Sequence, residues 1–121
     1  MYAINFYSAL YEHMLVRGRK TATIRLGDKR DKYRAGELVW ITVGPRFSPR
    51  RKLFAAIIDS VVVKPLSEVT PREIERENPE MRTHEELCEL LGRIYDRIVT
   101  MEDTVTVVHF SRVLEEGDRR P

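Results

Sequence analysis

The stretch GRKTATIR, residues 18–25, lies where the spacing of apolar residues changes from helical to extended. Before it, apolar residues recur at intervals of four, which predicts a helix over residues 6–16 that Gly18 closes. From Thr21 onward polar and apolar residues alternate, which predicts a strand with one polar face. The stretch is therefore either an edge strand kept soluble by its charges or the floor of a functional site.

Strands and helices then follow in a mixed order. Runs rich in β-branched residues predict three further strands, over residues 38–43, 53–63 and 104–114. Asp59 and Ser60 interrupt the second run and indicate a bulge or bend. Capping-box spacings at Thr70 and Thr83 predict the starts of two helices. The order helix, three strands, two helices, strand favours an α+β fold with a small curved or barrel-like sheet and helices at its ends.

The size and composition of the chain suit one folded domain. It has 121 residues, 42% of them apolar and 33% charged, and we place the domain at residues 1–114, with residues 115–121 as a tail that frays. Cys88 is the one cysteine, and the three histidines have no ligand spacing, so we expect no disulfide, no metal and no cofactor. Without an apolar run of about 18 residues or a signal-peptide pattern, we expect a cytoplasmic protein with no membrane contact, and a monomer.

Positive charge is concentrated in one part of the chain. Residues 17–52 carry a net charge of +9, whereas the rest carries −7. This asymmetry favours a basic face that attracts a polyanion such as RNA, with an ordinary solvated surface as the alternative. The loop GPRFSPRRK, residues 44–52, is either a phosphate-binding loop with a stacking aromatic or a solvated hairpin tip. Its candidate nucleic-acid-binding residues are Arg46, Phe47, Arg50, Arg51 and Lys52.

Several motifs taken together resemble an ASCH domain over about residues 6–112. They are GRKTATIR, the Gly36-Glu37 strand start, PLSEVTPREIERENP (65–79), LLGRIY (90–95) and VVHFSRV (107–113). The resemblance implies a PUA-like small β-barrel with an N-terminal helix and two helices before the last strand. ASCH domains include RNA-binding modules without catalytic activity, so the fold alone does not supply a reaction.

GRKTATIR is most similar to the motif of the small bacterial ASCH hydrolases that remove the acetyl group from N4-acetylcytidine. The motif lysine and threonine fall on Lys20 and Thr23, and the glutamate that precedes an asparagine falls on Glu77. The chain departs from that pattern in the basic loop at 45–52, which is longer, and at Pro79-Glu80, which resembles an insertion.

Amide hydrolysis needs a nucleophile, a base and a proton donor for the leaving amine. Thr23 is the candidate nucleophile, Lys20 the base and Glu77 the donor. Residues three apart on a strand point to opposite faces, so Lys20 and Thr23 converge only if Lys20 lies in the turn before the strand. The candidate substrate-binding residues are Arg19, Thr21 and Arg25.

Two functions stay open on the sequence. One is hydrolysis of N4-acetylcytidine or a related N-acylated pyrimidine nucleoside, and the other is a non-catalytic RNA-binding module. The plain structural alternative is a solvent-facing strand, with Glu77 in a surface ion pair with Arg72 or Arg76.

Overall fold

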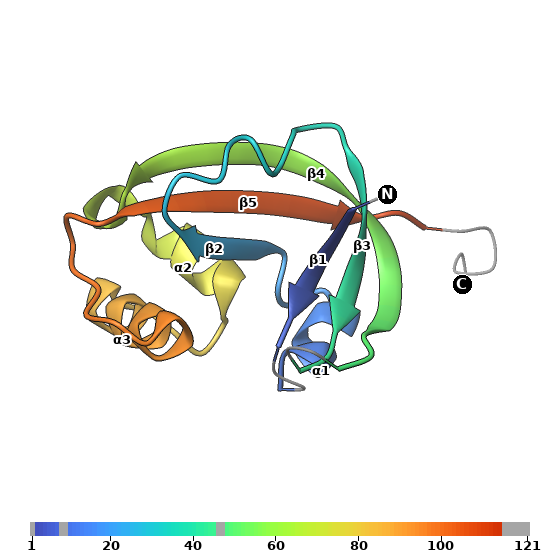
Figure 1. Cartoon of the computed structure of the whole chain (residues 1–121), viewed down its shortest axis with the longest axis horizontal. Helices are drawn as coiled ribbons and strands as arrows, with labels where there is room; N and C mark the ends of the chain where they lie inside the picture. Colours follow the sequence, from blue (N-terminus) through green and yellow to red (C-terminus); the bar gives the residue numbers. More distant parts are fainter. Residues whose placement is uncertain (1, 8–9, 46–47, 115–121) are drawn as a thin grey trace.

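A computed structural model describes residues 2–7, 10–45 and 48–114 of the chain. The strands in this part are β1 (Tyr2–Phe6), β2 (Ala22–Leu26), β3 (Leu38–Val43), β4 (Arg51–Pro65) and β5 (Thr104–Arg112). The helices are α1 (Leu10–Val16), α2 (Pro71–Glu77) and α3 (His84–Tyr95), with a 3-10 turn, η1, over Leu66–Glu68. Figure 1 shows one strongly curved sheet with α1 at one end and α2 and α3 at the other. The expected α+β barrel-like architecture is confirmed.

The strands form a single mixed sheet in the order β1-β3-β4-β5-β2. β1 runs parallel to β3, and the other neighbours are antiparallel. The register of β4 against β5 shifts between Ile58 and Ser60, which confirms the irregularity expected at Asp59 and Ser60. Such a shift increases the local twist and bend of a strand, and β4 and β5 sweep across the whole molecule in Figure 1.

The prediction for the N-terminus was wrong in one respect, because residues 2–6 form β1 and the helix is confined to α1. Phe6 is the last residue of β1 and 5% exposed, so it belongs to the sheet core and not to a helical stripe. Five residues are too few for a clear alternation. Their conformation is fixed by parallel pairing with β3, from Tyr2 opposite Val39 to Phe6 opposite Val43.

Both capping boxes predicted from sequence are present. The Thr70 hydroxyl accepts a hydrogen bond from the amide of Glu73, and the Glu73 carboxylate accepts one from the Thr70 amide. Thr83 and Glu86 form the same arrangement at the start of α3. These bonds satisfy amides that the first turn of a helix leaves without partners, so both helices begin where the sequence indicates.

The buried apolar side chains form two clusters. One joins β1, β3, α1, the first half of β4 and the second half of β5, and includes Ile4 and Ile41. The other joins β2, the first half of β5, α2 and α3, and includes Ile74 and Leu87. Lys20, in the segment between α1 and β2, lies against Phe6 of the first cluster and contacts Glu77 at the end of α2. Among the described helices, none is long and apolar enough to cross a membrane.

Candidate functional site

The site is centred on a lysine that is almost completely buried. Lys20 is 1% exposed, and its Nζ lies 2.7 Å from Oε1 of Glu77, 2.7 Å from the Glu77 carbonyl oxygen and 2.8 Å from the Ala22 carbonyl oxygen. The same nitrogen lies 5.0 Å from the ring centre of Phe6 and 4.9 Å from that of Tyr11. Lys20 precedes the first residue of β2, as the geometric requirement in the sequence demanded.

Glu77 reaches Lys20 from the last residue of α2. It is 5% exposed, and its second carboxylate oxygen, Oε2, accepts a hydrogen bond of 2.7 Å from the amide of Ile24. A further hydrogen bond of 3.0 Å, from the Thr21 amide to the Arg76 carbonyl, joins the segment before β2 to α2. The carboxylate of Glu77 is therefore fixed by both the lysine and the backbone of β2.

Thr23 lies between the two backbone groups that this pair holds, the Ala22 carbonyl and the Ile24 amide. Its Oγ1 accepts a hydrogen bond of 2.8 Å from Nε of Arg25, whose Nη2 donates to the Asn5 carbonyl at 3.2 Å. Among the described residues, no hydrogen bond joins the Thr23 hydroxyl directly to Lys20 or Glu77. Lys20 and Glu77 are in direct contact, and Thr23 is held beside them through the strand.

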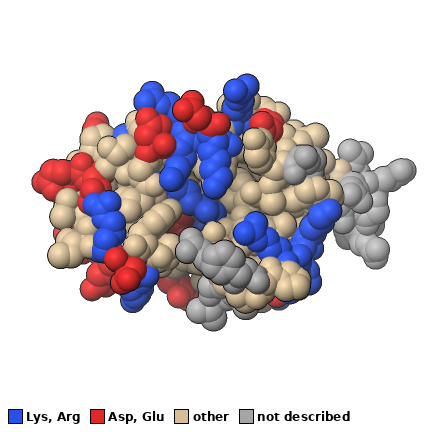
Figure 2. Space-filling view, viewed as in Figure 1, with Lys and Arg blue, Asp and Glu red and all other residues tan. Residues whose placement is uncertain are grey.

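Thr23, Arg25 and Glu77 line a cavity of about 880 Å³. Its walls come from β1 and α1, from the loop after β2, from the residues that follow α2, and from α3. This volume falls within the range of about 300–1,000 Å³ that is usual for small-ligand pockets. Figure 2 shows Lys and Arg side chains gathered in the middle of this face, over β2 and the loop at residues 27–36.

Burial and charge act in opposite directions on the pKa of Lys20. Desolvation lowers the pKa of Lys20, while the neighbouring Glu77 carboxylate raises it, and desolvation prevails. Tyr11 lines the large cavity, and burial and the charge of Glu77 raise the pKa of its hydroxyl to about 12. Tyr11 therefore stays protonated near neutral pH and can act as a hydrogen-bond donor to a ligand.

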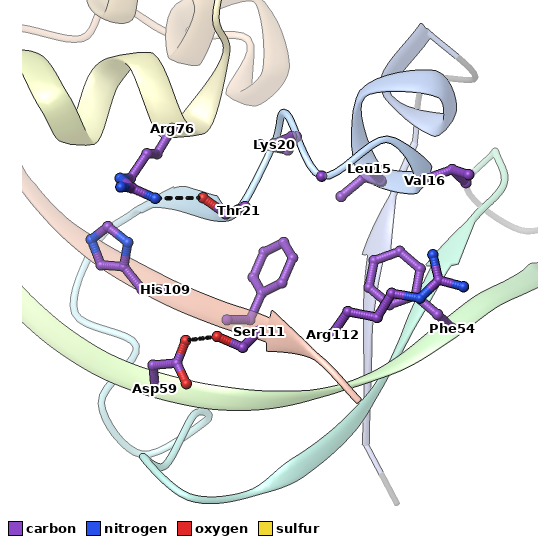
Figure 3. A pocket seen from close by; sticks show the side chains of 12 residues that line it. Leu15, Val16, Lys20, Thr21, Phe54, Asp59, Arg76, His109, Ser111 and Arg112 are labelled. Atoms are coloured by element: carbon purple, nitrogen blue, oxygen red, sulfur yellow. Dashed lines mark hydrogen bonds between the residues drawn. The ribbon is translucent and has the colours of Figure 1, made fainter. Parts of the chain in front are cut away.

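A second cavity, of about 330 Å³, lies beside the segment that leads into β2 (Figure 3). In it Nη1 of Arg76 donates to the Thr21 hydroxyl at 3.3 Å, and the Ser111 hydroxyl donates to Asp59 at 2.5 Å. Of the three predicted substrate-binding residues, Arg25 thus faces the large cavity and Thr21 the small one. Arg19 is exposed and is not among the described residues that line either cavity.

The basic loop lies apart from the large cavity. Arg46 and Phe47 fall outside the described residues. Arg50, Arg51 and Lys52 are exposed, and none of them lines either cavity. The Arg51 guanidinium forms an ion pair with Glu12 of α1, and Nζ of Lys52 lies 4.5 Å from the ring centre of Trp40.

Sequence reasoning missed several residues of the large cavity, namely Asn5, Tyr11, Lys29, Lys32 and Arg93. The basic character of residues 17–52 pointed to the two lysines as part of a charged segment, but not to their place beside Thr23. Asn5 lay in the strand that was not predicted. In the described part of the chain, no group of three or more His, Cys, Asp or Glu side chains could hold a metal ion.

No protein-family model matches the sequence, and no curated protein matches it closely. Solved structures do match. The structure of protein EF3133 from Enterococcus faecalis V583, described as DUF984, is 18% identical, with a TM-score of 0.68 over 93% of this chain and 80% of that one. The ASCH domain from Lactobacillus crispatus JV V101 is 13% identical, with a TM-score of 0.67 over 92% and 79%. Hypothetical protein PH0355 is 16% identical, with a TM-score of 0.66 over 93% and 98%. The chain therefore has the fold of an ASCH domain, a small PUA-like barrel.

Proposed function

We propose that the protein hydrolyses N4-acetylcytidine or a related N-acylated pyrimidine nucleoside, with Lys20, Thr23 and Glu77 as its catalytic residues. The observation that carries this proposal is the buried Lys20–Glu77 pair, held against the backbone on both sides of Thr23. Thr23 and Glu77 line the large, ligand-sized cavity, whereas Lys20 lines the small one. A buried ion pair is weak evidence for stability, because its desolvation cost offsets much of its attraction. A catalytic role supplies the reason to keep it.

The pair can hold its shared proton in either of two ways with the same positions of the heavy atoms. As an ammonium, Lys20 donates to all three oxygens around Nζ. As an amine, it donates to the two carbonyls and accepts from a protonated Glu77. In the second arrangement the lysine is a base and the glutamic acid is a donor, and the desolvation that lowers the pKa of Lys20 makes this arrangement accessible from the ion pair.

The neutral form gives a balanced acylation step. Lys20 takes the proton of the Thr23 hydroxyl, and the Thr23 oxygen attacks the acyl carbonyl carbon. The bond from that carbon to N4 of the base then breaks, and Glu77 gives its proton to the departing nitrogen. The products are the free amine, an acyl ester on Thr23, an ammonium on Lys20 and a carboxylate on Glu77.

Water completes the cycle. The Glu77 carboxylate takes a proton from the water that attacks the ester, and Lys20 returns its proton to the departing Thr23 oxygen. The acyl group leaves as the carboxylic acid, and both residues regain their starting forms. The Arg25 guanidinium favours these steps, because its hydrogen bond to Oγ1 stabilises an alkoxide more than a neutral hydroxyl.

The test is turnover of N4-acetylcytidine, with cytidine and acetate measured as products. Thr23→Val removes the hydroxyl at nearly constant volume and is expected to abolish turnover while the fold persists. Thr104→Val is the matched control, because Thr104 is an exposed strand threonine of β5 that lines neither cavity. No turnover by folded wild-type protein, or full turnover by Thr23→Val, would contradict the proposal.

RNA binding is the second candidate, and the exposed cations Arg50, Arg51 and Lys52 favour it, the last of them with Nζ 4.5 Å from the ring centre of Trp40. Such a surface can contact phosphates while an aromatic side chain stacks on a base. The expected result is RNA affinity that falls steeply with salt and is weakened by neutralising the three cations. Affinity that is insensitive to salt, or unchanged in the triple variant, would count against this candidate.

A further inference from the structure

The residues of the large cavity divide by exposure into a floor and a rim. Thr23 and Glu77 are 3% and 5% exposed and form the floor, where the proposed chemistry takes place. Lys32 and Arg93 also line the cavity but are exposed, and Lys29 is half-buried. A ligand whose acyl group reaches Thr23 therefore directs its opposite end toward these three cations.

Lys29 and Lys32 lie in a hydrogen-bonded turn of the loop that follows β2. The amide of Lys32 donates to the carbonyl of Lys29 at 3.0 Å, and the amide of Lys29 donates to Oγ1 of Thr106 in β5 at 2.8 Å. Tyr33, the next residue, is 5% exposed and belongs to the first core cluster. Lys29 and Lys32 are thus placed one turn apart at the rim by contacts with β5 and the core.

Arg93, in α3, lines another wall of the same cavity. Among the described residues, no ion pair joins Lys29, Lys32 or Arg93 to an acidic side chain, and Glu80 is the one exposed acid that lines the cavity. Asp28, in the same loop as the lysines, is held by Arg30 at 2.6 Å. The rim therefore has a surplus of positive charge that an uncharged nucleoside would not use.

We propose that the ligand is a pyrimidine nucleoside 5′-monophosphate, with its base at Thr23 and its phosphate between Lys29, Lys32 and Arg93. The inference rests on the proposed function in placing the base at the floor of this cavity. A phosphate carries the charge that the rim lacks, and Lys and Arg donors from two walls can contact it together. The volume of about 880 Å³ suits one nucleotide better than a continuous strand.

Calorimetric titration with CMP and with cytidine tests the inference without requiring turnover. CMP is expected to bind at least about tenfold more tightly than cytidine at low ionic strength, and this ratio should fall as salt is added. In Lys29→Gln/Lys32→Gln and in Arg93→Gln, the ratio should approach one while the cytidine affinity is kept. Arg34→Gln is the matched control, because this exposed cation of the same loop does not line the cavity.

Equal affinities for CMP and cytidine, an unchanged ratio in both rim variants, or no binding of either compound by folded protein would overturn the inference. Binding of a short RNA with no preference for CMP over cytidine would also overturn it, since the rim would then serve a nucleic-acid backbone. Hydrolysis of N4-acetylcytidine is measured separately. A CMP preference without turnover refutes the proposed reaction alone, and turnover without a CMP preference refutes this inference alone.

Discussion

Replacing Glu77 by Gln should destabilise the protein strongly, although the two side chains have nearly the same shape. The change leaves the Lys20 ammonium buried without its counter-charge and turns an amide N–H₂ or a weaker acceptor toward Nζ. The backbone amide of Ile24 can still bond to the Gln oxygen, so the loss concerns mainly the 2.7 Å contact between Lys20 and Glu77. Lys20→Met is the complementary change and leaves the carboxylate buried alone.

The burial of the pair sets the expected size of the effect. The side chains of Lys20 and Glu77 are 0% and 6% exposed, so water cannot replace the missing partner. Removing one partner from such a pair costs roughly 3–5 kcal/mol, out of a total free energy of unfolding of about 5–15 kcal/mol for a domain. The double variant Lys20→Met/Glu77→Gln removes both charges together and should be more stable than either single variant.

Urea unfolding measures these differences, followed by fluorescence of Trp40, which is the single tryptophan, and by circular dichroism. Arg97→Gln is the control, because its ion pair with Asp103 is exposed and should add little to stability. Losses below about 1 kcal/mol in both single variants, or a double variant whose loss equals the sum of the single losses, would refute the reasoning.

Two further changes test the fold. The pKa of Glu73 lies below its usual value of 4.5, because burial raises it but hydrogen bonds from Lys64 and Thr70 lower it and prevail. A carboxylate with a lowered pKa stabilises the folded state fully when the pH is above its usual pKa. This contribution is lost as the pH falls through the pKa of the folded state. The melting temperature of Glu73→Gln should therefore lie below that of the wild type at pH 7 and close to it at acidic pH. Glu75→Gln, at an exposed position, is the control. A difference in melting temperature that persists in acid would contradict this prediction. Gly44→Ala would place Cβ 2.9 Å from the Pro49 backbone oxygen, so the free energy of unfolding should fall by about 1–3 kcal/mol. An unchanged melting temperature would refute this expectation.

Local patterns in the sequence were sufficient for much of the fold. The capping boxes at Thr70 and Thr83 fix the starts of α2 and α3, because their hydrogen bonds span only three residues. The interruption at Asp59 and Ser60 marked the irregularity in β4. β1 escaped prediction because its partner, β3, begins more than thirty residues later, and no short-range pattern encodes that pairing.

The sequence by itself determined the types of residue at the candidate site and the need for Lys20 to lie before the strand. Only the tertiary structure decided that Lys20 and Glu77, 57 residues apart, meet in a buried contact, and that Lys29, Lys32 and Arg93 share a cavity with Thr23. The physical reason is that spacing along a chain fixes which residues share a face of one element. The distances between elements, and the loss of water around a charge, arise only when α2 packs against β2 and the segment that leads into it.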